Sequence, residues 1–273
     1  MTGAAPRPVR FADLGLRLAS GLVLAAIALV QLWAGGAWAA GFLALVLVLM
    51  LWEYHRMVTG SEAIAVPSLL VPCVAGVLSL VATAIWGPPV GLPCLVVAAG
   101  LVALAGRPWS GWLTAGFVYM TAAMGALLVF RDREPEGVLL ILWLVVVVVA
   151  ADVGAYFVGR RVGGAKLWPA VSPGKTWSGA IGGLAAAGLV GCFFAWLVVG
   201  WHPLRIGTLS LGIAVCSQFG DLLESAVKRR FGVKDASRLI PGHGGVMDRL
   251  DGVMGGVWFF AIADSLGIGT YGS

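Results

Sequence analysis

The sequence has few charged residues, few histidines and cysteines, and no asparagine. Only 11% of its 273 residues are charged and 60% are hydrophobic, whereas a soluble domain carries about 25% charged residues. These values exclude a soluble globular domain and a disordered chain. The four cysteines lie in apolar stretches without a Cys-x-x-Cys pair, which excludes a disulfide scaffold. Without asparagine there is no N-glycosylation acceptor, and no two of the three histidines stand at metal-ligand spacing.

Long apolar runs occupy most of the chain. A membrane-spanning helix needs about 20 such residues, and only helices or closed barrels satisfy their backbone groups in lipid. The runs are too long for barrel strands, so we expect an all-α, polytopic integral membrane protein with about nine transmembrane helices. The first run follows three arginines and is expected to be a retained helix rather than a cleaved signal. The predicted spans are 14–33, 38–56, 64–86, 89–106, 111–130, 138–159, 177–200, 206–227 and 252–270.

The basic residues are distributed unevenly over the predicted connections. With nine spans, 15 of the 18 Lys and Arg fall on the side of the N-terminus and of the two long loops, 160–176 and 228–251. The positive-inside rule therefore predicts that the N-terminus and both loops are cytosolic, in a multi-pass protein of the cell (inner) membrane. The net charge of +5 reflects this topology and calls for no nucleic-acid partner. We expect N-terminal transmembrane helices over 1–110 and a catalytic region over 111–273.

Five acidic residues lie in the predicted spans or at their ends. A charged side chain at the bilayer centre costs about 2.5–3.5 kcal/mol on insertion scales, so such residues are usually functional. Glu53 and Asp264 are expected to be interfacial anchors. Asp152, Asp221 and Glu224 instead lie near the cytosolic ends of spans that lead into the two basic loops.

The helix that ends near residue 227 carries a polar face. Asp221, Ser225 and Lys228 are spaced i, i+4, i+7 and share that face. Glu224 and Lys228 form an i, i+4 pair that could simply stabilise the helix. This face points to chemistry at the start of the second loop.

Further along that loop, Gly242, Gly244 and Gly245 surround His243. Such a segment suits close backbone approach to a ligand and can hold phosphate oxygens with its N–H groups. Asp248 and Asp251 follow at i, i+3, so a helix would present both on one face.

The three carboxylates of Asp221, Asp248 and Asp251 are hard oxygen ligands of the kind that Mg²⁺ takes. Enzymes that catalyse phosphoryl or nucleotidyl transfer typically use carboxylates, a metal ion and basic side chains. The alternative is an ordinary loop of mixed charge. The basic residues alongside are Lys228, Arg229, Lys234 and Arg249.

The first loop contains a phosphate-binding pattern that is incomplete. Its Gly174-Lys175-Thr176 imitates the end of a Walker A motif, but position 169 is Pro where the first Gly belongs. Lys175, Ser172 and Thr176 can still bind phosphate. The tetrapeptide from Ser225 to Lys228 matches Ser-x-x-Lys only by chance.

The segment 225–251, SAVKRRFGVKDASRLIPGHGGVMDRLD, closely resembles the signature of phosphatidate cytidylyltransferases, also called CDP-diacylglycerol synthases. Upstream, Asp152, Tyr156 and Arg160 and the stretch 172–176 are similar to the preceding loop of that family. The resemblance covers about 150–256. It departs at Ser178, where the family usually has Glu, and this puts any contact of that carboxylate in doubt.

The resemblance implies that CTP and phosphatidic acid react to CDP-diacylglycerol and pyrophosphate, for phospholipid biosynthesis. It implies catalytic roles for Asp221, Asp248, Asp251 and Lys228, with Mg²⁺ on the three aspartates and room for a second cation. It also implies membrane-lipid contacts and a homodimer. The substrate-binding residues would be Asp152, Tyr156, Arg160, Ser172, Lys175, Thr176, Ser225, Arg229, Lys234, His243, Gly244 and Arg249.

Four alternatives remain open on the sequence. Headgroup motifs do not report the lipid tail, so an ether or isoprenoid lipid phosphate could be the acceptor. A CDP-alcohol phosphotransferase is disfavoured because Gly255 and Gly256 stand where its motif requires Ala-Arg. A transporter would use the intramembrane acids as an ion path. An inactive relative is the fourth, because of Ser178.

Overall fold

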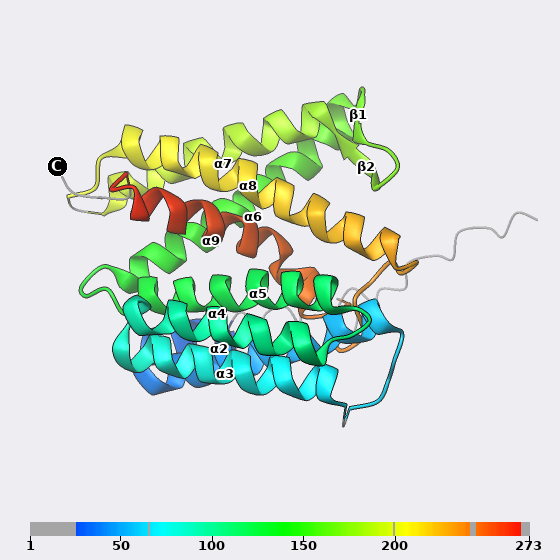
Figure 1. Cartoon of the computed structure of the whole chain (residues 1–273). Coiled ribbons are helices and arrows are strands. Elements are labelled where there is room, and N and C mark those ends of the chain that lie inside the picture. The colour runs from blue at the N-terminus through cyan, green and yellow to red at the C-terminus, as the bar shows by residue number, and fades with distance from the viewer. Residues whose placement is uncertain (1–25, 65, 199, 241–243, 269–273) are drawn as a thin grey trace, which may run out of the picture.

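The computed structural model describes residues 26–64, 66–198, 200–240 and 244–268, and most of them are helical (Figure 1). Seven helices, α2 to α8, are long and apolar enough to cross a membrane. The predicted all-α, polytopic class is therefore confirmed. The helices are α2 (Gly36–Thr59), α3 (Pro67–Trp86), α4 (Pro88–Ala105), α5 (Ser110–Arg131), α6 (Gly137–Val162), α7 (Trp177–Leu197), α8 (Pro203–Arg230) and α9 (Met247–Ser265).

The boundaries differ from the predicted spans mainly at the ends that carry charge. The first predicted span, 14–33, lies largely outside the described residues, although 26–34 are helical. Helix α9 starts with charged residues, among them Asp248 and Asp251, and is not among the seven apolar helices. Helices α6 and α8 continue beyond their apolar runs, because backbone hydrogen bonding does not end where hydropathy falls. The connections between helices shrink to 163–176 and 231–246.

The first of these connections holds the two strands found in the described part of the chain. Strands β1 (Lys166–Trp168) and β2 (Ser172–Thr176) pair antiparallel. Thr176 then caps α7, because its Oγ1 accepts a hydrogen bond from the Gly179 N–H at 3.1 Å. The predicted loop is thus a hairpin anchored to the start of a helix, and the anchor fixes the place of the residues on β2.

The helices form two groups that meet along α5 (Figure 1). Helices α2 to α5 pack together, α6 to α9 form the second group, and α5 contacts both α6 and α9. The large side chains of Phe117, Trp143 and Phe260 are fully buried in one core that both groups share. The hairpin, the end of α8 and the start of α9 lie at the same end of the bundle. Both basic connections therefore lie on one side, as the span parity predicted.

At the opposite end of α9, Asp264, which was expected to be an interfacial anchor, forms a bidentate ion pair. Arg133, in the α5–α6 connection, donates to both Asp264 oxygens at 2.6 and 2.5 Å. Because both side chains are partly exposed, the pair should stabilise the fold by only about 1 kcal/mol.

We expect Asp264→Asn to lower the thermal midpoint in detergent by about 2–4 °C and to leave catalysis unchanged. Asp132→Asn is the matched control, because Asp132 lies 3.7 Å from Arg131 and its side chain is about twice as exposed as that of Asp264. Thermal unfolding of both variants checks this. Equal midpoints for wild type and Asp264→Asn would contradict it.

Candidate active site

A cavity of about 580 Å³ lies at the hairpin end of the bundle, enclosed by α6, the hairpin, the start of α7 and α8. Half of the sixteen residues that line it are charged or polar, and both signs of charge are present. The charged and polar side chains on its wall are Asp152, Tyr156, Arg160, Lys166, Lys175, Thr176, Gln218 and Asp221. Six of these eight were predicted from the sequence. Lys166 and Gln218 were not, because no motif singles them out.

An ion pair joins the hairpin to α8 across this cavity. The Lys175 ammonium lies 2.5 Å from Asp221 Oδ2, and both side chains are partly exposed to the cavity. Asp221 Oδ1 also accepts a hydrogen bond from the Ser225 hydroxyl at 3.3 Å. On α6, Arg160 donates to the Tyr156 hydroxyl at 2.7 Å. The cavity thus presents guanidinium and ammonium groups beside a carboxylate, a combination that can hold phosphate groups.

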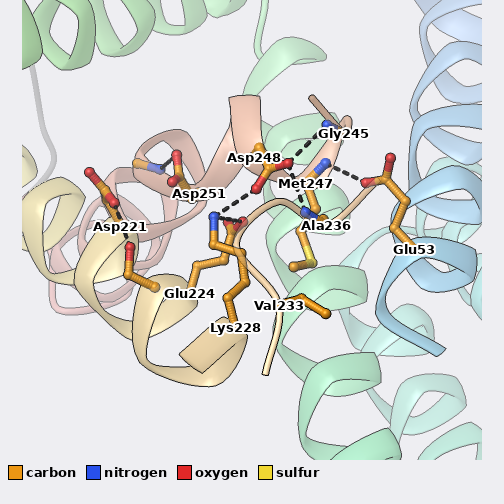
Figure 2. A network of polar contacts seen from close by, with 12 residues as sticks. Glu53, Asp221, Glu224, Lys228, Val233, Ala236, Gly245, Met247, Asp248 and Asp251 are labelled. Atoms are coloured by element: carbon orange, nitrogen blue, oxygen red, sulfur yellow. Dashed lines mark hydrogen bonds and ion pairs between the residues drawn. The ribbon is translucent and has the colours of Figure 1, made fainter. Parts of the chain in front are cut away.

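A second polar cluster is buried between the ends of α8 and α9 (Figure 2). The Lys228 ammonium donates to Glu224 Oε1 at 3.1 Å and to Asp248 Oδ1 at 2.6 Å. The Lys228 side chain is only 10% exposed. Asp248 Oδ2 accepts the backbone N–H groups of Ala236 and Gly245, each at 2.9 Å. Both oxygens of Asp248 are therefore occupied by donors.

Asp248 lies in the first turn of α9, outside the seven apolar helices. Burial alone would raise the pKa of its carboxyl group. The hydrogen bonds from Lys228 and from the two backbone N–H groups outweigh burial and hold the pKa below its usual value. Asp248 is therefore a carboxylate at neutral pH, matched by the charge of Lys228.

The three aspartates predicted as metal ligands do not converge. Asp248 Oδ1 accepts a hydrogen bond from the Lys228 ammonium, and Asp251 Oδ1 accepts one from the Gly252 N–H at 2.7 Å. Among the described residues, no group of three His, Cys, Asp or Glu side chains could hold a metal ion. Asp251 and Asp221 remain within electrostatic range of each other. A pair of carboxylates is left, which suits a cation that takes its other ligands from substrate and water.

Glu53 corrects the sequence prediction most clearly. Rather than anchoring α2 at the interface, it is fully buried and accepts hydrogen bonds from Ser237 and from the backbone of Val246 and Met247. These partners are more than 180 residues away in the sequence. An acidic residue near a span end was the one available signal, and it could not identify them.

The other predicted site residues are spread around the two clusters. Ser172 pairs with Trp168 at the start of β2. Arg229 and Lys234 are exposed, and Arg229 donates to the Val233 carbonyl at 3.0 Å. β2 and the end of α8 lie at the same end of the molecule.

The glycine segment before α9 is described only in part. Gly244 adopts a φ of 83°, which favours glycine, and its carbonyl accepts the Ile240 N–H. His243 lies outside the described residues. Arg249 is exposed and lies close enough to Asp152, on α6, to act on it electrostatically.

Ser178 has a structural role at the base of the hairpin. Its hydroxyl donates to the Gly163 carbonyl at 2.5 Å and lies 3.1 Å from Thr176 Oγ1. A carboxylate at this position would have no proton to donate to that carbonyl. Ser178 thus ties the start of α7 to the end of α6, a contact that depends on a donor.

Comparison with known proteins gives consistent matches. The model of the cytidylyltransferase family matches residues 15–266. A Brucella suis protein named phosphatidate cytidylyltransferase is 47% identical over 159 residues, which is 57% of this chain and 59% of the relative. A Helicobacter pylori protein of the same name is 36% identical over 250 residues, covering 88% of this chain and 85% of the relative. The match to the Brucella protein thus spans less than two thirds of that protein, whereas the Helicobacter match runs along most of both chains.

Proposed function

The chain belongs to the cytidylyltransferase family, and we propose that it transfers the cytidylyl group of CTP to phosphatidic acid, giving CDP-diacylglycerol and pyrophosphate. The observation that carries this proposal is the cavity lined by Arg160, Lys166 and Lys175, together with the buried Lys228–Asp248 pair further along helix α8, which also contributes Asp221 to the cavity wall. The pair and the cavity lie at one end of a bundle of apolar helices. A water-soluble nucleotide and a lipid headgroup could meet there.

The proposed reaction is a direct displacement at phosphorus. An oxygen of the lipid phosphate forms a bond to the α-phosphorus of CTP, and the bond from that phosphorus to the bridging oxygen of the β-phosphate breaks. Pyrophosphate leaves with the electron pair. Negative charge gathers on the phosphate oxygens during this step, and fixed ammonium and guanidinium groups stabilise it. The reaction requires no nucleophile from the protein.

The two polar clusters support different parts of this reaction. Lys175, on the anchored hairpin, and Arg160 reach the cavity and would hold the triphosphate. Lys228 is oriented by two carboxylates, Glu224 and Asp248, so its ammonium is preorganised to face developing negative charge. The Lys175–Asp221 ion pair holds the two side chains in place.

We include Mg²⁺ in the proposal, held by Asp221 and Asp251. The two carboxylates suit this ion, because Mg²⁺ typically combines one or two carboxylates with substrate phosphate oxygens and waters. When bound, the ion would neutralise charge on the triphosphate. Asp248 is not assigned to the metal, because its side chain is only 6% exposed and both of its oxygens accept hydrogen bonds from buried donors, whereas Asp221 is partly exposed in the cavity.

We place the site on the cytosolic side of the inner membrane. The uneven distribution of Lys and Arg favours that orientation, and CTP is a cytosolic nucleotide. The homodimer rests on the resemblance alone. Light scattering of the detergent-purified protein would test it.

The function is tested by incubating the detergent-purified full chain with CTP and phosphatidic acid and detecting CDP-diacylglycerol by mass spectrometry. We expect product with Mg²⁺ and none with EDTA. Parallel reactions with ether and isoprenoid lipid phosphates identify the acceptor class, and ATP in place of CTP controls for nucleotide choice. Failure of the folded protein to use any of these lipid phosphates would exclude the proposed activity.

A further inference from the structure

Glu53 does not line the cavity and is not among the residues proposed above to bind substrate or metal. It lies on α2, in the N-terminal half of the chain and outside the segment 150–256 that carries the resemblance. Glu53 is completely buried, with 0% of its surface exposed. A carboxylate buried to this extent is costly unless hydrogen bonds compensate it. Its hydrogen-bond partners among the described residues are Ser237 and Val246, in the connection between α8 and α9, and Met247, the first residue of α9 (Figure 2 shows the Met247 contact).

These contacts cap α9 from another helix. Glu53 Oε1 accepts the Ser237 hydroxyl at 2.5 Å and the Val246 N–H at 2.9 Å, and Oε2 accepts the Met247 N–H at 2.8 Å. The first N–H groups of a helix lack partners within the helix. Val246, the N-cap residue of α9, supplies no capping side chain. Glu53 fills that role, and its negative charge is favourable at a helix N-terminus.

The same short stretch of backbone also binds Asp248. Of three successive N–H groups, that of Gly245 goes to Asp248 and the next two go to Glu53. Asp248 follows Met247 directly and meets Lys228 at 2.6 Å. The position of the Asp248 carboxylate relative to Lys228 therefore depends on where Glu53 holds the start of α9.

Gly245 makes this arrangement possible. A Cβ atom at Gly245 would lie 2.6 Å from Glu53 Oε1, closer than real Cβ contacts. The absence of a side chain at this position lets the carboxylate reach the backbone. The close approach of the Glu53 carboxylate, on α2, to this backbone explains why position 245 is a glycine.

We propose that Glu53 is a positioning residue for the reaction: it holds the first turn of α9 so that Asp248 and Lys228 keep their geometry. Its kinetic consequence rests on the proposed function. Its structural consequence, protection of the Val246 and Met247 amides, does not depend on any activity.

The test is Glu53→Gln. Glutamine has the same shape, but its NH₂ group would face one of three donors, so at least one hydrogen bond is lost. A displacement of about 1 Å at a reacting group can cost about 10²-fold in rate, and we expect kcat to fall about 10- to 100-fold. The KM for CTP should change less than about threefold, because Lys175 and the cavity wall do not contact Glu53. Hydrogen–deuterium exchange at Val246 and Met247 should become faster.

Glu62→Gln is the matched control. Glu62 follows α2 at the same end of the molecule, is exposed, and pairs with Arg56 at 2.9 Å. This variant should match the wild type in kcat, KM and exchange. Ser237→Ala, which removes a single donor to Glu53, is the milder second variant, and we expect a severalfold fall in kcat at constant KM.

The proposal is overturned if Glu53→Gln keeps wild-type kcat, or if exchange at Val246 and Met247 stays unchanged. It is also overturned if the KM for CTP rises as steeply as kcat falls, because a general loss of structure would do that. If Glu53→Gln cannot be purified folded, Ser237→Ala decides by the same readouts. If the wild-type chain makes no CDP-diacylglycerol, only the proposed function is rejected. The exchange measurement then still decides whether Glu53 caps α9.

Discussion

Asp248→Asn is expected to lower kcat by at least about 10²–10³-fold, the range seen when a preorganised stabilising group is removed. Asp248 accepts hydrogen bonds only, from Lys228 on one oxygen and from Ala236 and Gly245 on the other. An asparagine must point its NH₂ group at one of these donors. Either orientation loses a hydrogen bond and the negative charge that holds Lys228. Formation of CDP-diacylglycerol, followed by mass spectrometry, measures the loss.

Asp264→Asn provides the control for this experiment, since it makes the same chemical change at the other end of α9. It should retain wild-type activity despite its lower thermal midpoint. The double variant Asp248→Asn/Lys228→Met should be no slower than the worse single variant, because the two residues act as a unit. Asp248→Asn protein with more than half of the wild-type kcat would exclude the assigned role.

Lys175→Met is the second change with a large expected effect. The hairpin places the Lys175 ammonium in the cavity, 2.5 Å from Asp221. We expect kcat/KM for CTP to fall about 10²-fold, because a charge-assisted contact to phosphate is lost and Asp221 loses its counter-charge. Steady-state titration with CTP measures this. Lys175→Arg should recover part of the loss, since it keeps the charge but not the compact shape of the ammonium.

Arg161→Met serves as the control for charge at this end of the molecule. Arg161 is exposed at the end of α6, one residue after Arg160. Its removal should change kcat/KM less than about twofold. A fall for Arg161→Met as large as that for Lys175→Met would assign the effect to net charge instead of to the hairpin site.

The local sequence pattern was sufficient to predict many structural features of this protein. Most spans could be predicted within a few residues, because about 20 apolar residues in succession have few alternatives in a bilayer. The Glu224–Lys228 contact followed from i, i+4 spacing, and the structure confirms it at 3.1 Å. Thr176 was predicted in the site and lines the cavity.

Long-range partners could not be predicted in this way. Lys175 and Asp221 are 46 positions apart, and only the packing of α7 against α8 decides that they meet. The hairpin at 166–176 was predicted as a loop, because its strands are three and five residues long and carry no alternating pattern. Glu53 was misjudged because its partners lie in a different part of the chain.

The amino-acid sequence by itself determined the membrane class, the gathering of acidic and basic residues at one end of the spans, and the motif over 225–251. These follow from hydropathy, span parity and residue order, which are properties of the linear chain. Only the tertiary structure decided which carboxylate serves which partner. Asp248 binds Lys228 instead of joining Asp221 and Asp251, and Glu53 crosses from α2 to cap α9. Ion pairs and hydrogen bonds act over a few ångströms, so helix packing decides them.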